Sequence, residues 1–203
     1  MQLIGVLKSP YVRRTAISLQ MLGVAFEHRS LSTFDNEDEY RAINPALKAP
    51  TLVCDDGTVM LDSSLILQYA EAALSLRSLW PDNPAGLQRD FALVSMAMAA
   101  CDKAVQYIYE VYRRPESAQL DSWRERVVQQ SQGAFTELER QLQQNPQAVA
   151  SDECQLSVTA AVVWQFVWEY AGELLQPLQC PGLEALSRRM ESHPVFRQFS
   201  LSP

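Results

Sequence analysis

Three short segments of this 203-residue chain carry side chains that could bind a polar ligand. Residues 9–14 read SPYVRR, residues 44–52 read NPALKAPTL and residues 61–64 read LDSS. Each segment is weakly specific alone, but their order and spacing along the chain together are more specific. We therefore take these segments as the candidate functional site.

Ser9 is the residue in these segments that is best placed to do chemistry. It directly precedes Pro10, and this pair is typical of a helix start because serine caps helices and proline suits the first turn. Helix-start amides carry the positive end of the helix dipole, so a hydroxyl placed there can help to stabilise an anion. Ser9 either only caps the helix or also stabilises an anion.

The first segment lies inside a predicted strand–helix–strand unit. Apolar spacing predicts strands at residues 2–7 and 25–31 and a helix at residues 11–22, which Gly23 would end. Two strands joined by a helix over so short a stretch are expected to be parallel, with a right-handed crossover. The acidic stretch that follows, residues 32–40, predicts a short irregular helix.

The other two segments flank a predicted hairpin. Residues 51–54 and 59–61 enclose an Asp-Asp-Gly-Thr turn, which is a strong signal for two paired strands. Asp62 and Ser63 then open a helix. The first eighty residues thus predict a four-stranded mixed sheet with helices packed on it.

The remainder of the chain predicts helices only. Residues 79–84 read LWPDNP and resemble an interdomain linker. We place a first domain at residues 1–78, the linker at residues 79–86 and an all-helical domain at residues 87–203. Helical spacing predicts helices at residues 85–112, 120–144, 157–175, 182–191 and 194–199.

The helix predicted at residues 157–175 is the most apolar of these. We expect it to form the buried centre of the helical domain, with Trp164 and Trp168 four residues apart on it. Ser157 would begin this helix without the acidic partner that completes a capping box.

Composition excludes several classes of protein. Hydrophobic residues make up 47% and charged residues 20% of the chain, which argues against disorder. Seventeen basic against 24 acidic side chains give a net charge of −7 without a basic stripe, so we expect no nucleic-acid partner. The longest apolar stretch is too short for a membrane span, and the first residues hold no basic leader, so we expect a cytoplasmic protein. Four scattered cysteines and two histidines predict no metal site.

The order of elements and the three segments resemble the cytosolic glutathione S-transferase family, in its bacterial, serine-type form. The resemblance covers nearly the whole chain. It implies a thioredoxin-like four-stranded mixed sheet with helices at the N-terminus and a helical bundle at the C-terminus. It also implies a cytoplasmic homodimer in which contacts come from Leu65, Tyr69, Arg89 and Phe91.

The resemblance gives Ser9 the catalytic role. Its hydroxyl would donate to the glutathione thiol and lower a pKa whose ordinary value is about 8.5, so that more of the thiol is ionised. Tyr11 lies in the same segment and could bind glutathione or replace Ser9 as the donor. Because the position holds serine rather than cysteine, disulfide exchange by the enzyme is disfavoured.

The same resemblance assigns the rest of the glutathione site. The Ala49–Pro50 bond would be cis, and Ala49 would offer its backbone groups to the cysteinyl part of the peptide. Lys48 would meet the glycyl carboxylate. Ser63 would bind the γ-glutamyl carboxylate, and Asp62, which is shorter than the glutamate common at this place, would reach the ammonium.

The implied function is transfer of glutathione, as co-substrate and without a metal, to a small hydrophobic electrophile. The electrophile would lie among the first helix, the helix at residues 85–112 and the end of the chain; candidate lining residues are Met96, Met98, Tyr107, Tyr109 and Tyr112. Two alternatives stay open. One is a non-catalytic regulatory or interaction protein of the same fold, and the other is a glutathione-dependent isomerase, dehalogenase or peroxidase.

Overall fold

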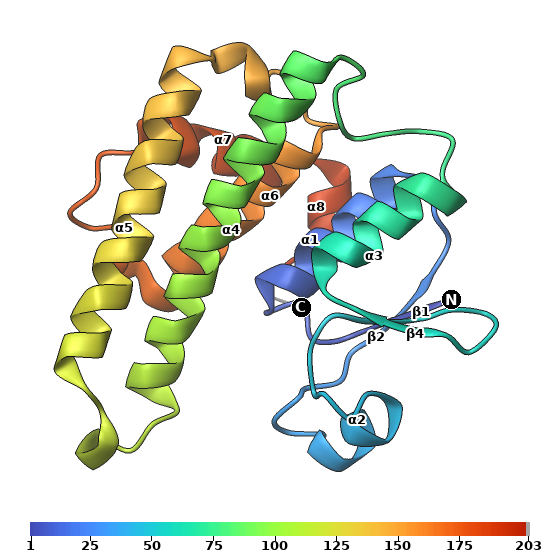
Figure 1. The fold of residues 1–203 in the computed structure, drawn as a ribbon, viewed down its shortest axis with the longest axis horizontal. Helices are drawn as coiled ribbons and strands as arrows, with labels where there is room; N and C mark the ends of the chain where they lie inside the picture. Colours follow the sequence, from blue (N-terminus) through green and yellow to red (C-terminus); the bar gives the residue numbers. More distant parts are fainter. Residues whose placement is uncertain (202–203) are drawn as a thin grey trace. The chain divides into compact units, whose positions relative to one another are not determined.

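The computed structural model describes residues 1–201, which form two compact units. Within the described residues, the first unit combines Met1–Leu79 with residues 192–201, and the second is Trp80–Glu191 (Figure 1). The predicted helical domain at residues 87–203 differs from this division in two respects, because the last helix lies in the first unit and the second unit begins at Trp80.

The first unit is built on a four-stranded sheet in the order β2-β1-β3-β4. β1 (Gln2–Ile4) and β2 (Glu27–Arg29) are parallel, and β3 (Thr51–Val53) is antiparallel to both β1 and β4 (Val59–Leu61). The mixed sheet, the parallel pair and the hairpin confirm the predicted fold class.

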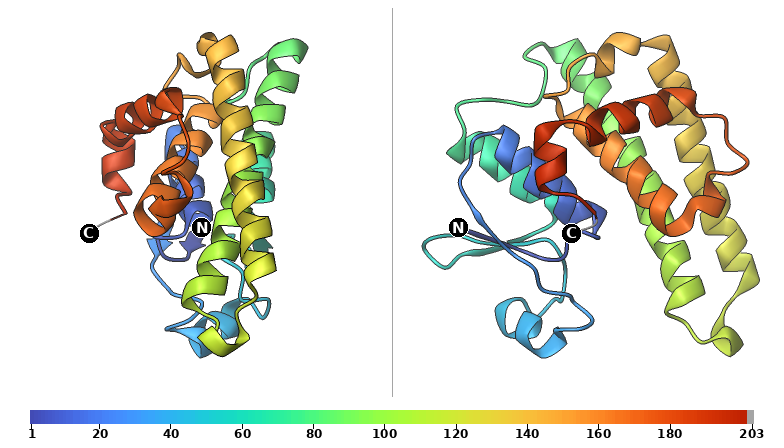
Figure 2. Two further views of the ribbon diagram at one scale, coloured as in Figure 1. Left: turned by 90° about the vertical axis from the view of Figure 1, so that its left-hand side faces the viewer. Right: turned by 180° about the vertical axis from the view of Figure 1, so that it is seen from behind.

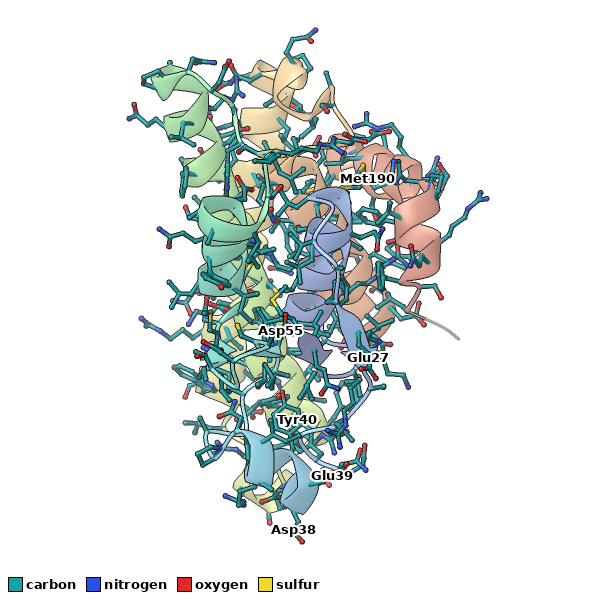
Figure 3. The ribbon with its side chains drawn as sticks, turned by 90° about the vertical axis from the view of Figure 1, so that its right-hand side faces the viewer. Glu27, Asp38, Glu39, Tyr40, Asp55 and Met190 are labelled. Carbon is teal, nitrogen blue, oxygen red and sulfur yellow. The ribbon has the colours of Figure 1, made fainter. Side chains whose placement is uncertain are left out.

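Helices cover both faces of this sheet. α1 (Pro10–Met21) and α3 (Ser63–Tyr69), which continues as a π turn over Ala70–Leu74, lie on one face, and α2 (Glu37–Ile43) lies on the other (Figures 1 and 2). α2 is amphipathic: Tyr40 points inward and is fully buried, whereas Asp38 and Glu39 point to the outside (Figure 3).

The last helix, α8 (Pro194–Gln198), packs on α1. Arg13 of α1 is fully buried, its Nε donates to the Phe199 carbonyl at 2.8 Å, and its guanidinium lies 5.3 Å from the Phe196 ring centre. Phe199 also stacks on Phe26 of the sheet region, with ring centres 6.0 Å apart. These contacts explain why the end of the chain joins the first unit.

The second unit is helical. α4 (Pro84–Tyr112), α5 (Asp121–Gln144), α6 (Gln155–Ala171) and α7 (Pro181–Glu191) pack together, and short 3-10 turns at Glu116–Ala118, Pro146–Val149 and Gly172–Leu174 connect them. Among residues 1–201, α4 alone is long and apolar enough to cross a membrane. A core helix of a bundle passes the same test, and α4 packs on α5 and α6.

Two predictions for α6 were wrong. The helix begins at Gln155 rather than Ser157, because Cys154 caps it: the Cys154 Sγ accepts from the Ser157 amide at 3.3 Å. Trp164 is 5% exposed and lies in the core, but Trp168 is 58% exposed. A helix of this apolarity still has one face turned outward, and Trp168 lies on it.

Candidate functional site

Strand register brings the three sequence segments to one edge of the sheet. Ile4, the last residue of β1, pairs with Thr51, the first of β3, and Thr51 also pairs with Leu61, the last of β4. The chain that leaves β1 toward Ser9, the chain that enters β3 and the chain that leaves β4 therefore lie side by side. The meeting of the three segments is thus a consequence of antiparallel pairing on both sides of β3.

Gly5 lies where the first two segments touch. It has a φ of +140°, and a Cβ placed on it would lie 2.5 Å from Val12 Cγ2 and 3.3 Å from Ala49 Cβ. Glycine is needed here both for the backbone conformation and for this close approach. His28 of β2 hydrogen-bonds the Gly5 carbonyl at 2.8 Å and so supports the loop that leads to Ser9.

Ser9 is the N-cap of α1, with Pro10 following in the first turn. Its Oγ accepts from the Val12 amide at 3.4 Å, a long hydrogen bond, and the side chain is half-buried. A serine hydroxyl accepts through lone pairs and donates through its hydrogen, so capping leaves the O–H available to a ligand. Tyr11 is half-buried in the same turn.

The Ala49–Pro50 bond is cis, as predicted. The carbonyl of the preceding residue, Lys48, accepts from three buried donors: Thr51 Oγ1 at 2.9 Å, Asn44 Nδ2 at 3.2 Å and Tyr40 Oη at 3.3 Å. Asn44 and Tyr40 also bond the Thr51 hydroxyl, at 2.9 and 3.1 Å. This network joins α2 to β3 and fixes the backbone that enters the Ala49–Pro50 bond. The sequence pattern does not predict this network, although Asn44 begins the segment at residues 44–52.

Lys48 and Asp62 form an ion pair, Nζ to Oδ2 at 3.3 Å, with both side chains partly exposed. Asp62 has a φ of +75° and is the N-cap of α3, where its Oδ1 accepts from the Ser64 amide at 2.9 Å. Burial alone would raise the pKa of the Asp62 carboxyl, but hydrogen bonds from Ser64 and Lys48 outweigh burial and lower it. Two residues expected to meet opposite ends of the ligand thus meet one another.

Ser63 and Ser64, the first residues of α3, are held from α1. The Arg14 Nη1 donates to Ser63 Oγ at 3.0 Å and to Ser64 Oγ at 3.1 Å. Arg14 and Ser63 are buried, whereas Ser64 is exposed. Arg14 lies within the SPYVRR segment, but the sequence pattern predicts no role for it.

The site therefore presents four kinds of group at one edge of the sheet. They are a hydroxyl at a helix start, a lysine, a carboxylate and two serines that accept hydrogen bonds from Arg14. These groups suit an extended molecule that carries both carboxylate and ammonium groups. Within the part of the chain that the structure describes, no group of three or more metal-ligating side chains occurs.

The residues expected to line an electrophile pocket are distributed along α4. Tyr109 and Tyr112 are exposed, and Met96 and Met98 are half-buried. Tyr107 lines a cavity of about 310 Å³ within the helical unit, and its hydroxyl donates to Glu173 Oε1 at 2.8 Å. Their role toward a substrate stays a prediction.

Comparison with known proteins agrees with this geometry. Residues 3–78 match the family described as glutathione S-transferase, N-terminal domain. The chain is 28% identical over 121 residues to the uncharacterized GST-like protein YibF of Escherichia coli, an alignment that covers 60% of this chain and 59% of that protein. The chain spans about three fifths of the length of the curated relatives it matches.

Solved structures extend the likeness to the whole chain. A glutathione S-transferase from Methylobacterium radiotolerans, in complex with glutathione sulfonate, is 25% identical with a TM-score of 0.84 and covers 97% of this chain and 92% of its own. One from Methylobacillus flagellatus with bound glutathione is 20% identical, with a TM-score of 0.87 and 98% of both chains covered. Together these matches show a glutathione S-transferase N-terminal domain signature over residues 3–78 and the fold of solved glutathione S-transferases over the whole chain.

Proposed function

We propose that this protein is a glutathione transferase, which binds glutathione at the sheet edge and adds its thiolate to a small hydrophobic electrophile. The observation that carries the proposal is the meeting of Ser9, the cis Ala49–Pro50 bond and the start of α3 at that edge. The glutathione-bound neighbours of the same fold support it.

In this proposal each end of the peptide has its own partners. Ser63 binds the γ-glutamyl carboxylate and Lys48 binds the glycyl carboxylate. Asp62 receives the ammonium once the ligand has separated it from Lys48, a step that partly exposed ion pairs allow at little cost. Ala49 offers backbone groups to the cysteinyl residue, and Tyr11 contacts the peptide beside Ser9.

The chemistry is formation of a carbon–sulfur bond. The thiol proton of glutathione is lost to solvent, and the Ser9 hydroxyl donates to the thiolate that remains. The sulfur lone pair attacks the electrophilic carbon; in a substitution the leaving group departs with its bonding electrons, and in an addition the adjacent carbanion takes a proton from water. Ser9 stabilises the nucleophile and remains neutral throughout.

Ser9→Ala tests the role of the hydroxyl. Glutathione affinity should change little, because Ala49, Lys48 and Ser63 still hold the peptide. The rate at neutral pH should fall by roughly tenfold to a thousandfold, the effect of losing one donor to an anion. The apparent pKa of the bound thiol, followed by thiolate absorbance, should rise toward about 8.5. Ser122→Ala, on the exposed surface of α5, is the matched control.

The outcomes separate the alternatives. Full activity and an unchanged pH profile in Ser9→Ala, with both lost in Tyr11→Phe, would transfer the donor role to Tyr11. Glutathione binding without turnover on a panel of electrophiles would favour the non-catalytic reading. Turnover by isomerisation, dehalogenation or peroxide reduction alone would keep the site and change the reaction.

We further propose that the protein acts as a cytoplasmic homodimer. Leu65 on α3 and Phe91 on α4 are apolar and 61% and 53% exposed, as expected for side chains that a second copy would cover. Phe91 stacks on Trp80, with ring centres 4.3 Å apart, which holds the exposed ring in one orientation.

A further inference from the structure

We propose that Arg14 is a positioning residue for the carboxylate end of the ligand. Its guanidinium donates hydrogen bonds to the hydroxyl oxygens of Ser63 and Ser64. Both hydroxyl protons are then directed toward the bound peptide. The inference rests on the proposed function, and it adds the part of the molecule that would recognise an α-carboxylate.

The geometry is that of one cation shared by two hydroxyls. Arg14 lies on α1, is 2% exposed, and places a single nitrogen, Nη1, 3.0 Å from Ser63 Oγ and 3.1 Å from Ser64 Oγ. The two serines are the first two residues of α3, and α1 and α3 pack against each other. The guanidinium therefore lies between α1 and α3, in contact with the first two residues of α3.

The chemistry of the three groups limits the directions in which the hydroxyl protons can point. A guanidinium only donates hydrogen bonds, whereas a hydroxyl accepts through two lone pairs and donates one hydrogen. Arg14 thus fills one acceptor position on each serine oxygen. Because Arg14 cannot accept a hydrogen bond, each O–H donates to some other group. A carboxylate only accepts, so it is the ligand group that matches two such donors, and polarisation by the cation strengthens them.

The backbone at the start of α3 has less to offer an anion. The Ser64 and Leu65 amides already donate to Asp62 Oδ1, at 2.9 and 3.4 Å. The Asp62 carboxylate also repels a second carboxylate nearby. The positive charge of Arg14 next to the two serines offsets this repulsion. The buried Arg14 would therefore favour carboxylate binding in addition to joining two helices.

The test compares two peptides. One is glutathione, and the other is 4-aminobutyryl-cysteinyl-glycine, which lacks only the γ-glutamyl α-carboxylate. Wild-type protein should bind glutathione about tenfold to a hundredfold more tightly, the usual effect of hydrogen bonds to a charged group. Arg14→Met should remove most of this preference by weakening the binding of glutathione. The affinity for the peptide without the α-carboxylate should stay within about twofold.

Three further measurements isolate the positioning role. Arg14→Lys keeps the charge but cannot serve both hydroxyls in the same geometry, so it should restore only part of the preference. The pKa of the bound thiol should stay at the wild-type value, because Ser9 is untouched. Arg41→Met, on the exposed face of α2, is the matched control and should leave both affinities unchanged.

The results distinguish this inference from the proposed function. Equal weakening of both peptides in Arg14→Met would show a merely structural role and overturn the inference alone. Failure of wild-type protein to bind either peptide would overturn both. If Arg14→Met does not fold, the double variant Ser63→Ala with Ser64→Ala supplies the same comparison: a retained preference for glutathione there would refute the inference.

Discussion

The buried network behind Lys48 makes a quantitative prediction about stability. Asn44 is 2% exposed; its Nδ2 donates to Lys48 O at 3.2 Å and to Thr51 Oγ1 at 2.9 Å, and its Oδ1 accepts from the Ala46 amide at 2.9 Å. Asn44→Ala removes all three hydrogen bonds. At about 0.5–1.5 kcal/mol each, the free energy of unfolding should fall by about 2–4 kcal/mol.

Tyr40→Phe gives the contrasting case in the same network. It removes one hydroxyl, whose partners lie at 3.1–3.4 Å, and both Lys48 O and Thr51 Oγ1 keep their bonds from Asn44. No acceptor among these two is left without a donor, so the loss should be only about 1 kcal/mol. The ratio of the two effects is the informative quantity.

Urea denaturation measures both variants, provided the probe reports the first unit. The four tryptophans, at positions 80, 123, 164 and 168, all lie in the second unit, so their fluorescence does not report the network directly. Hydrogen exchange of the Leu47 amide at increasing urea concentration does, since this amide donates to the Asn44 backbone carbonyl, which both substitutions keep. Asn145→Ala, exposed on the second unit, is the control. An Asn44→Ala loss no larger than that of Tyr40→Phe would refute the reasoning.

Two further predictions concern the helical unit and assembly. Burial, with the hydrogen bond and charge of Glu173, raises the pKa of Tyr107 to about 12, so in an absorbance titration the signal lost in Tyr107→Phe should titrate near pH 12 and not near pH 10. Because this pKa lies above the unfolded value, the contribution of Tyr107 to stability is complete below pH 10 and is lost as the pH rises toward 12. In sedimentation at micromolar concentration the wild type should run as a dimer and Phe91→Glu should shift it toward the monomer; a monomeric wild type would contradict the proposed assembly.

The elements predicted most accurately are those whose signals are local. The Ser9–Pro10 pair and the Asp-Asp-Gly turn each determine the conformation of a few adjacent residues, and the structure has α1 and the hairpin where they were predicted. The start of α6 was missed because Cys154 is not a usual cap, although its Sγ accepts the same amide hydrogen bond that a serine would. Local signals do not predict that α8 lies in the first unit, because its contact between Phe196 and Arg13 spans more than 180 residues of sequence.

The same distinction explains the site. Segments 9–14, 44–52 and 61–64 could be recognised individually, but the partner of each side chain lies in another segment. Lys48 pairs with Asp62, and Arg14 holds Ser63. Spacing along the chain carries no information on such pairs, because strand register alone brings the segments together.

The capping and donating roles predicted for Ser9 are compatible with one another. Capping and donation were treated as alternatives, but they use different parts of one hydroxyl: the Val12 amide takes a lone pair, and the hydrogen remains. Ser63 is in the same situation, with Arg14 in place of the amide. In both cases a donor from the protein occupies the oxygen and so limits the directions in which the O–H can point. A serine whose acceptor side is already filled is a better-oriented donor than a free one, and the cap is therefore part of what would prepare Ser9 to meet a thiolate.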